Sequence, residues 1–281
     1  MALSIHTNYA SLVTQSNLNK TNGNLSTAQQ RLGTGYRVNS AADDAAGLQI
    51  ATRLNAQSRG MDVASRNTGD AISLLQTAEG AFTEITDITQ RLKDLATQAA
   101  NDTNSADDRT ALQGEFDALV SEIANIYDNT TYAGEKLFNA TGGKLTDSVQ
   151  FQIGATADEK LEFDVSTKLG DMDTLIGTDL AALDLSSASG AASAITDLAT
   201  ALDDIGSLRA DFGANINRLN HTANNLANMK DNTDVARGRI IDADFASESA
   251  NMTKNSMLMQ SGISMLRQSG QMPSMVMSLL G

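Results

Sequence analysis

The side chains that perform most protein chemistry are scarce in this chain. Its 281 residues contain no cysteine and two histidines, His6 and His221, neither of which lies in an H-E-x-x-H sequence. The chain therefore has almost none of the cysteine and histidine side chains that zinc sites and Ser-His-Asp triads require. We predict that the protein is not an enzyme and that it has no catalytic residue, no metal and no cofactor.

Two short groups of residues resemble binding motifs, and each has a structural interpretation. Residues 33–35 begin a G-x-G pattern, but no third glycine follows at the required place and the preceding segment has a helical pattern. We interpret them as a helix stop. Asp43 and Asp44 have the charge to bind a cation, although adjacent carboxylates at a helix start more often act as caps that favour the helix dipole.

Charge divides the chain into a middle and two ends. The 34 acidic and 20 basic residues give a net charge of −14, which disfavours binding to nucleic acid. Residues 1–42 and 249–281 nevertheless contain no Asp or Glu, and their charged side chains are Lys20, Arg31, Arg37, Lys254 and Arg267. The two ends therefore share an environment that carboxylates would disturb, which indicates a packed contact between helices or between subunits. This pattern favours assembly over catalysis.

The composition also bears on shape and location. One proline, no tryptophan and 4% aromatic residues suit long helices better than a bulky globular interior. No stretch of about 18 apolar residues is present, so we predict no membrane insertion. The N-terminus lacks the residue order of a secretory signal, but an export route that reads an unfolded N-terminus would leave the same pattern.

Three segments have apolar residues at alternating steps of three and four, the rhythm of a coiled-coil seam. They cover residues 50–99, 105–127 and 195–226, and Arg209 interrupts the last of them. Two capping boxes are predicted at helix starts: Ser40 with Asp43, and Ser105 with Asp108. The predicted fold class is mainly α, a long antiparallel coiled-coil helical bundle with a small β-hairpin region and paired terminal helices.

A β-hairpin is predicted where the spacing of apolar residues changes from the helical period to every second residue. Apolar and polar residues alternate on both sides of a glycine-containing loop at Val149, Phe151 and Ile153, then at Leu161, Phe163 and Val165. The predicted hairpin covers about 145–166, whereas 177–193 has no clear period and is interpreted as a short variable connection. The predicted domains are 1–42 with 249–281 as terminal helices, 43–176 with 194–248 as the bundle with its hairpin, and 177–193 as the connection.

The terminal helices are predicted to depend on neighbours. Residues 5–32 form an amphipathic helix whose partner is 245–266, but they offer too few large apolar side chains to offset the entropy of ordering the backbone. We therefore predict that both ends are loose in the monomer and become ordered when neighbouring subunits bury them. Seven of the eleven methionines lie within 252–277, as core filler or as an adaptable surface for several partners.

Segments at both ends of the chain resemble one family, bacterial flagellin, the subunit of the flagellar filament. Six segments in order carry the resemblance: HTNYASLVTQSNLNK (6–20), RLGTGYRVNSAADDAAGLQIATRLN (31–55), RNTGDAISLLQTAEGAFTEI (66–85), RADFGANINRL (209–219), IDADFASE (241–248) and SMVMSLLG (274–281). The C-terminal pattern resumes soon after the hairpin, so the chain resembles a short flagellin with little outer variable domain.

The resemblance implies that the terminal helices line the inner core of a filament and that the bundle forms the next shell outward. It also implies export in unfolded form through the flagellar type III apparatus to an extracellular filament. The implied partners are further copies of the chain, an export chaperone, and cap and hook-junction proteins. The predicted self-assembly residues on the terminal helices are Ile5, Leu12, Leu18, Leu25, Leu32, Phe245, Met252, Met259, Ile263, Leu266, Leu279 and Leu280.

The resemblance further implies recognition by the flagellin-sensing Toll-like receptor of animals. The residues that fit this pattern are Gln90, Arg91, Leu92, Lys93, Leu95, Gln98 and Glu115. Residues 237–239 (Arg-Gly-Arg) depart from the family, which usually has a small polar residue before a single Arg, and Arg267 lies in a segment that is usually uncharged. Because a helical glycine costs roughly 1 kcal/mol relative to alanine, we expect a bend or break near Gly238.

Two other functions remain open at this point. The flagellar hook-filament junction protein resembles flagellin at its ends but does not extend indefinitely. A soluble coiled-coil interaction module would share the heptads, although it would need neither a hairpin nor acid-free ends. An enzyme between the two halves would need a larger insert and a metal motif, and the sequence contains neither.

Overall fold

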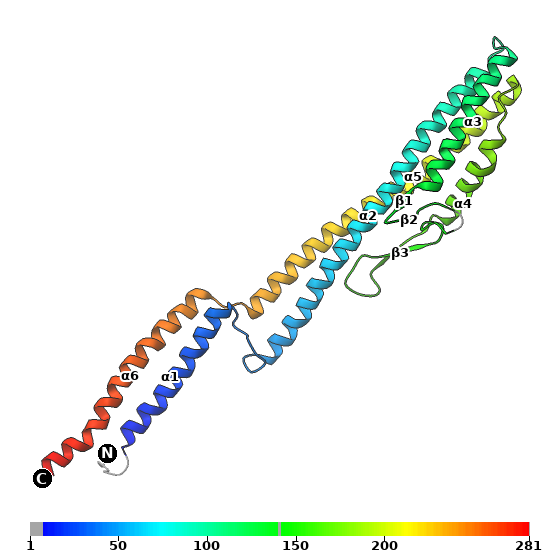
Figure 1. Ribbon diagram of the computed structural model, residues 1–281. Helices are drawn as coiled ribbons and strands as arrows, with labels where there is room; N and C mark the ends of the chain where they lie inside the picture. Colours follow the sequence, from blue (N-terminus) through cyan, green and yellow to red (C-terminus); the bar gives the residue numbers. More distant parts are fainter. Residues whose placement is uncertain (1–7, 140–141, 281) are drawn as a thin grey trace. The chain divides into compact units, whose positions relative to one another are not determined.

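The computed structural model describes residues 8–139 and 142–280, with side chains up to residue 271 (Figure 1). Its elements are α1 (Tyr9–Thr34), α2 (Ala45–Ala99), α3 (Ala106–Asn129), β1 (Thr131–Tyr132), β2 (Glu135–Lys136), β3 (Val149–Gln152), β4 (Lys160–Phe163), α4 (Ser166–Thr174), α5 (Ala188–Ile241) and α6 (Phe245–Leu280). They divide into two compact units, 1–58 with 231–281 and 59–230. The predicted fold class is confirmed.

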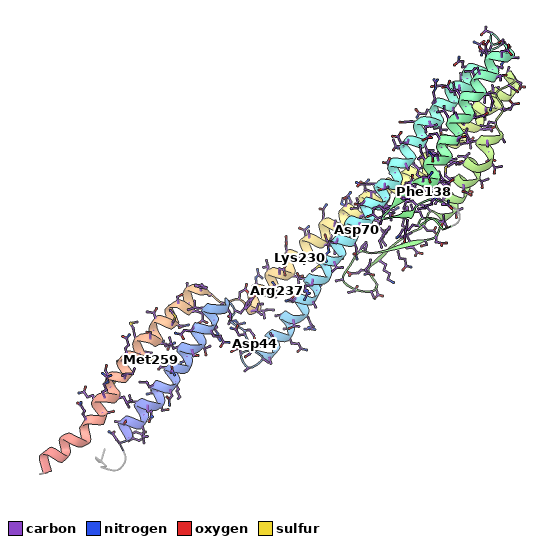
Figure 2. The ribbon with its side chains drawn as sticks, viewed as in Figure 1. Asp44, Asp70, Phe138, Lys230, Arg237 and Met259 are labelled. Atoms are coloured by element: carbon purple, nitrogen blue, oxygen red, sulfur yellow. The ribbon has the colours of Figure 1, made fainter. Side chains whose placement is uncertain are left out.

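Residues 59–230 form a helical bundle around a hydrophobic core. The stretches of α2 and α5 in this unit bury the seam positions that the sequence predicts, among them Leu75, Phe82, Leu92, Leu198, Ile205, Phe212 and Leu219. Aromatic rings pack together inside the core: the ring centroid of Phe138, labelled in Figure 2, is near two others. It lies 5.0 Å from the centroid of Phe82 and 5.4 Å from that of Tyr127. This unit therefore has a packed interior of its own.

Two antiparallel hairpins lie in the same unit. In the β3–β4 pair, Val149 is opposite Phe163 and Phe151 is opposite Leu161, which confirms the hairpin that the sequence predicts. The β1–β2 hairpin was not predicted. Its turn, Ala133–Gly134, has positive φ at both residues, as a type I′ turn requires. Alanine is uncommon in that conformation, so the sequence signal was weak.

The segment 177–193 is packed although its sequence shows no period. It passes through one turn of π-helix (Leu175–Asp179) and one 3₁₀ turn (Leu180–Ala182) before α5 begins. Leu180 and Leu185 are buried in the bundle core. Successive helical geometries with different numbers of residues per turn explain why no single period appears. The variability of this segment stays a prediction.

The start of α2 differs from the predicted capping box. The Asp43 carboxylate accepts hydrogen bonds from the backbone amide and hydroxyl of Ser40, which closes a turn in front of the helix. The helix begins at Ala45, and the carboxylate of Asp44 accepts from the amide of Gly47 at 2.8 Å (Figure 2). The prediction that Ser40 caps this helix was wrong, because its hydrogen bonds with Asp43 are used within the preceding turn.

Other helix ends agree better with those predicted from the sequence. The capping box of Ser105 and Asp108 is present at the start of α3. Gly35 ends α1 with φ +75°, so the helix stop predicted at 33–35 is confirmed. Helix α5 continues through Gly238 and ends at Ile241, so the break comes shortly after the glycine rather than at it.

Candidate self-assembly surface on the terminal helices

Helices α1 and α6 pack against each other as an antiparallel pair, here called the terminal pair (Figure 1). Three contacts fix their register. The Asn8 side chain donates to the carbonyl oxygen of Ser269 at 2.7 Å, and Arg31 donates to Glu248 at 2.9 Å. Between them, Leu18 lies over Gly262, where an added Cβ would come within 2.7 Å of its Cδ1 atom.

The side chains between the two helices follow a seven-residue repeat. In α1 and α6, every described residue outside this repeat and its immediate flanks is exposed. The positions of the repeat itself, here called the seam, are partly or fully buried: Ser11, Thr14, Leu18, Thr21, Leu25, Ala28 and Leu32 on α1, and Glu248, Met252, Asn255, Met259, Gly262, Leu266 and Ser269 on α6. Steps of three and four keep both rows on the shared face.

Large apolar side chains also point away from the seam. Eight of them are exposed on α1 and α6, here called the outward set: Tyr9, Leu12, Val13, Phe245, Met257, Leu258, Ile263 and Met265. In the described part of the larger unit, 59–230, Val63 and Met229 are the two exposed large apolar residues. Concentrated apolar exposure of this kind marks a surface that another molecule covers. Among the described residues, no helix has the length and apolar character needed to cross a membrane.

The predicted self-assembly residues fall into three groups. Six lie in the seam: Leu18, Leu25, Leu32, Met252, Met259 and Leu266. Three are exposed in the outward set: Leu12 at 54%, Phe245 at 62% and Ile263 at 38%. Ile5 lies outside the described residues, and so do the side chains of Leu279 and Leu280.

Several members of the outward set were not among the predicted self-assembly residues. Val13, Met257, Leu258 and Met265 fall between the seam positions, so a search for one apolar stripe passes over them. The signal was present as excess apolar residues off the stripe. Met259 lies in the seam (Figure 2), as core filler would, while Met257 and Met265 are exposed, and their role as an adaptable surface for partners stays a prediction.

Hydrogen bonds at the helix ends hold the terminal pair in place. Asp244 precedes α6 and accepts from the amides of Ala246 and Ser247. The amide and hydroxyl of Ser247 lower the pKa of the Asp244 carboxyl. The chain segments next to the pair are also joined, because the amide of Arg37 donates to the carbonyl oxygen of Ile241 at 2.6 Å. The end of α1 is therefore tied to the start of α6 beyond the seam.

The receptor-recognition candidates occupy two environments on α2 and α3. Gln90, Arg91, Gln98 and Glu115 are exposed and Lys93 is half-buried, whereas Leu92 and Leu95 lie inside the bundle core. Arg91 donates to the carboxylate of Glu115 at 2.7 Å, with about half of each side chain exposed. Arg91 and Glu115 therefore form an exposed ion pair that links α2 and α3.

Two sequence profiles of one family match the chain. The bacterial flagellin N-terminal helical region matches residues 5–142, and the bacterial flagellin C-terminal helical region matches residues 195–280.

Curated relatives match nearly end to end. The flagellin of Halalkalibacterium halodurans is 44% identical over 90% of each chain, and that of Listeria innocua is 36% identical over 99% of each. Flagellin A of Vibrio anguillarum is 34% identical over the whole of both chains. That last alignment runs over 382 positions although this chain has 281 residues, so the chain is short beside the Vibrio protein.

Two solved structures also match the chain. The crystal structure of Bacillus cereus flagellin is 34% identical with a TM-score of 0.49, covering 57% of this chain and 88% of that one. A chain described as a flagellar hook-associated protein from Vibrio parahaemolyticus has a TM-score of 0.58 at 13% identity, covering 71% of this chain and 100% of that one. At that identity, the second match shows the fold alone.

Proposed function

This chain belongs to the bacterial flagellin family and is a structural subunit of the flagellar filament, and we propose that its terminal helices, 1–42 with 249–281, drive polymerisation. The observation that carries this proposal is the outward set, eight large apolar side chains exposed on a pair of helices. In the proposed filament these side chains are buried against neighbouring subunits, so the terminal helices form its inner core. The activity is mechanical, and no catalytic role is proposed.

The terminal pair has no hydrophobic core of its own, so we infer that its helices become ordered only as the subunit joins the filament. Ala28 and Ser269 are the fully buried residues among the described side chains of α1 and α6. This burial is too small to offset the entropy lost in ordering two long helices. Burial of the outward set by neighbours supplies the missing free energy, so folding of the ends and growth of the filament occur together. Residues 59–230, with their own core, stay folded in the monomer.

Seeded growth tests this proposal directly. Short filament seeds are added to purified monomer, and growth is followed by sedimentation and negative-stain electron microscopy. We expect long filaments from the full chain and none from a chain trimmed to residues 43–248. Point variants sharpen the result: Leu12→Gln and Met265→Gln should slow growth, whereas the matched control Asn19→Gln on the exposed face of α1 should not. Equal growth of all three variants would refute a role for the outward set.

Several partners are proposed because the chain belongs to the flagellin family, and not because of any contact within this chain. We propose that the chain is exported unfolded to an extracellular filament, with an export chaperone before secretion and cap and hook-junction proteins at the filament ends. Loose termini suit such a route, because an export apparatus must thread an unfolded chain. Strong amide-exchange protection of residues 9–34 in dilute monomer would contradict loose termini.

The hook-filament junction protein is the nearest competing role. A junction protein adds once or a few times to an end, whereas a filament subunit adds repeatedly through head-to-tail contacts. Measuring filament length against the amount of added monomer separates the two roles. Length that rises in proportion to monomer supports a filament subunit, and growth that stops after a short addition supports a junction protein.

A second proposed activity is recognition by the flagellin-sensing Toll-like receptor. The exposure of Gln90, Arg91, Gln98 and Glu115, two of which form an ion pair between α2 and α3, supports it. Leu92 and Leu95 would act from the core by holding these exposed side chains in position. We expect Arg91→Ala to weaken binding to the receptor ectodomain, with Arg66→Ala, another exposed α2 arginine, as the matched control. No change with Arg91→Ala would count against recognition at these residues.

A further inference from the structure

The apolar part of the seam does not by itself define one alignment of α1 with α6. Leu18, Leu25 and Leu32 recur every seven residues, as do Met252, Met259 and Leu266 on the other helix. If one helix slid by seven residues, each of these large apolar side chains would move to the place of the next one in its row, so both rows would stay within the shared face. Gly262 does not prevent such a slide, because Leu25 would enter the space that Leu18 now fills.

One of the three register contacts, the ion pair of Arg31 with Glu248, is between charges that do not recur along the two helices. Glu248 is the one acidic residue in the sequences of α1 and α6, and its side chain is 12% exposed. Its partner Arg31, 29% exposed, lies 2.9 Å away in the last turn of α1. Both charges also favour the dipoles of their helices, the cation at a C-terminus and the anion at an N-terminus.

Sliding the helices by seven residues in either direction separates this pair. The three contacts of the terminal pair place residues opposite one another when their numbers add to about 279. One slide would set Glu248 against Asn24, and the opposite slide would set Arg31 against Asn255. Lys20 cannot replace Arg31, because it lies eleven residues away, which is not a multiple of seven. Each slide therefore leaves a largely buried charge without an opposite charge.

We propose that Arg31 and Glu248 are positioning residues for assembly, a register clamp that selects one alignment of the terminal pair and thereby fixes where the outward set is presented. The inference rests on the proposed function of the terminal helices. In a slid pair, the side chains of α6 would be displaced along α1 by about 10 Å, seven residues at 1.5 Å each. Such a subunit would present the outward set of α6 to its neighbours about 10 Å out of place and would fit them less well.

Because the chain has no cysteine, engineered cysteine pairs can report the alignment. Ala28→Cys with Met252→Cys reports the native register, and Ala28→Cys with Met259→Cys reports the slide that sets Arg31 against Asn255. Each reporter is placed in the full chain, grown on wild-type seeds and treated with a short thiol cross-linker. On a denaturing gel, a cross-link within one chain is a band near single-subunit mass whose mobility differs from that of the untreated chain, whereas a cross-link between chains has twice that mass. With the clamp intact, we expect the native reporter to dominate.

The decisive variant replaces both charges, Arg31→Met with Glu248→Met. It replaces the two charged side chains by apolar ones and can even tighten packing, so a residue pair that only stabilised the helices would leave the reporters unchanged. We expect the ratio of slid to native cross-link to rise by about tenfold or more, the ratio that corresponds to losing a charged hydrogen bond. Gly262→Ala is the control, because it perturbs packing under Leu18 while leaving the clamp intact.

The outcomes separate this inference from the proposed function. Native cross-linking alone in the double variant would overturn the clamp. If the double variant fails to grow, Glu248→Gln carries the same test, because it keeps the size and an acceptor oxygen but removes the charge, and native cross-linking alone would again overturn the clamp. Failure of the wild-type chain to extend seeds would instead overturn the proposed function.

Discussion

Arg209 shows how one side chain can interrupt a sequence pattern without disturbing the fold. It lies between the buried positions Ile205 and Phe212 on α5. Its guanidinium donates to the Glu79 carboxylate at 2.8 Å and to the hydroxyl of Thr83 at 3.0 Å, both on α2. The interruption that the sequence shows is therefore a polar link between two bundle helices, and its partners could not be predicted from the period.

Removing this link should weaken the bundle by a measurable amount. We expect Arg209→Ala to lower the free energy of unfolding by about 1–2 kcal/mol, because charged hydrogen bonds are lost at a partly exposed site. Thermal unfolding of the monomer by circular dichroism measures the effect. Arg66→Ala, an exposed arginine on α2, is the control and should change little. Equal effects of the two variants would contradict a specific role for Arg209.

The same link makes part of the stability depend on pH. The Arg209 guanidinium lowers the pKa of Glu79 below the ordinary value of 4.5. A carboxyl whose pKa is lower in the folded state contributes stability above its unfolded pKa and loses that contribution as pH falls through the folded pKa. The difference in melting temperature between wild type and Arg209→Ala should therefore shrink from about pH 6 to about pH 3. A constant difference over that range would contradict this coupling.

At the scale of elements, contact between the β3–β4 loop and α2 explains a glycine inside a helix. A Cβ added to Gly60 would lie 2.8 Å from the Cβ atom of Ala155, in the loop. The Asn67 side chain, two turns further along α2, donates to the carbonyl oxygen of Gln152. The hairpin is therefore held against the helix at two places, and one of them requires the absence of a side chain.

Two glycine substitutions on α2 should then have opposite effects. Gly80→Ala has open space around it and should stabilise the bundle by about 1 kcal/mol, the helix-propensity difference. Gly60→Ala gains the same propensity but pushes the loop away, so we expect a net loss of about 1 kcal/mol. Denaturant unfolding of the monomer measures both. Adding Ala155→Gly to Gly60→Ala should restore stability, and an equal gain from both single variants would rule out the contact.

The elements also show where sequence reasoning succeeded and where it stopped. The seams of α2 and α5 were predictable because buried leucines, isoleucines and phenylalanines repeat at helical steps over many turns. The terminal pair gave a weaker pattern, since Thr21 and Asn255 occupy seam positions while Met257 and Leu258 are exposed. The clamp partners, Arg31 and Glu248, lie 217 residues apart, and no local pattern joins them.

At the scale of the whole molecule, charge and apolar exposure are segregated along the chain. The net charge is −14, yet residues 1–42 and 249–281 contain five basic and no acidic residues. Apart from Phe245, the outward set therefore lies in the part of the chain that lacks carboxylates. An incoming subunit nevertheless brings its acidic bundle toward a filament end made of the same acidic bundles, so we expect net repulsion during approach.

Screening of this repulsion should speed filament growth. The Debye length falls from about 30 Å at 0.01 M salt to about 8 Å at 0.15 M, so the rate of elongation on seeds should rise as NaCl is added over that range. Growth is followed by light scattering at fixed monomer and seed concentrations. Once the Debye length is shorter than the spacing between bundles, further NaCl should have little effect on the rate.

A rate that falls with NaCl would instead mean that opposite charges attract the subunit to the tip. Carboxylates of one subunit would then lie against the basic ends of another. The Lys20→Gln variant separates the two cases, because it should leave the rate nearly unchanged under repulsion between bundles and slow it under attraction to the ends.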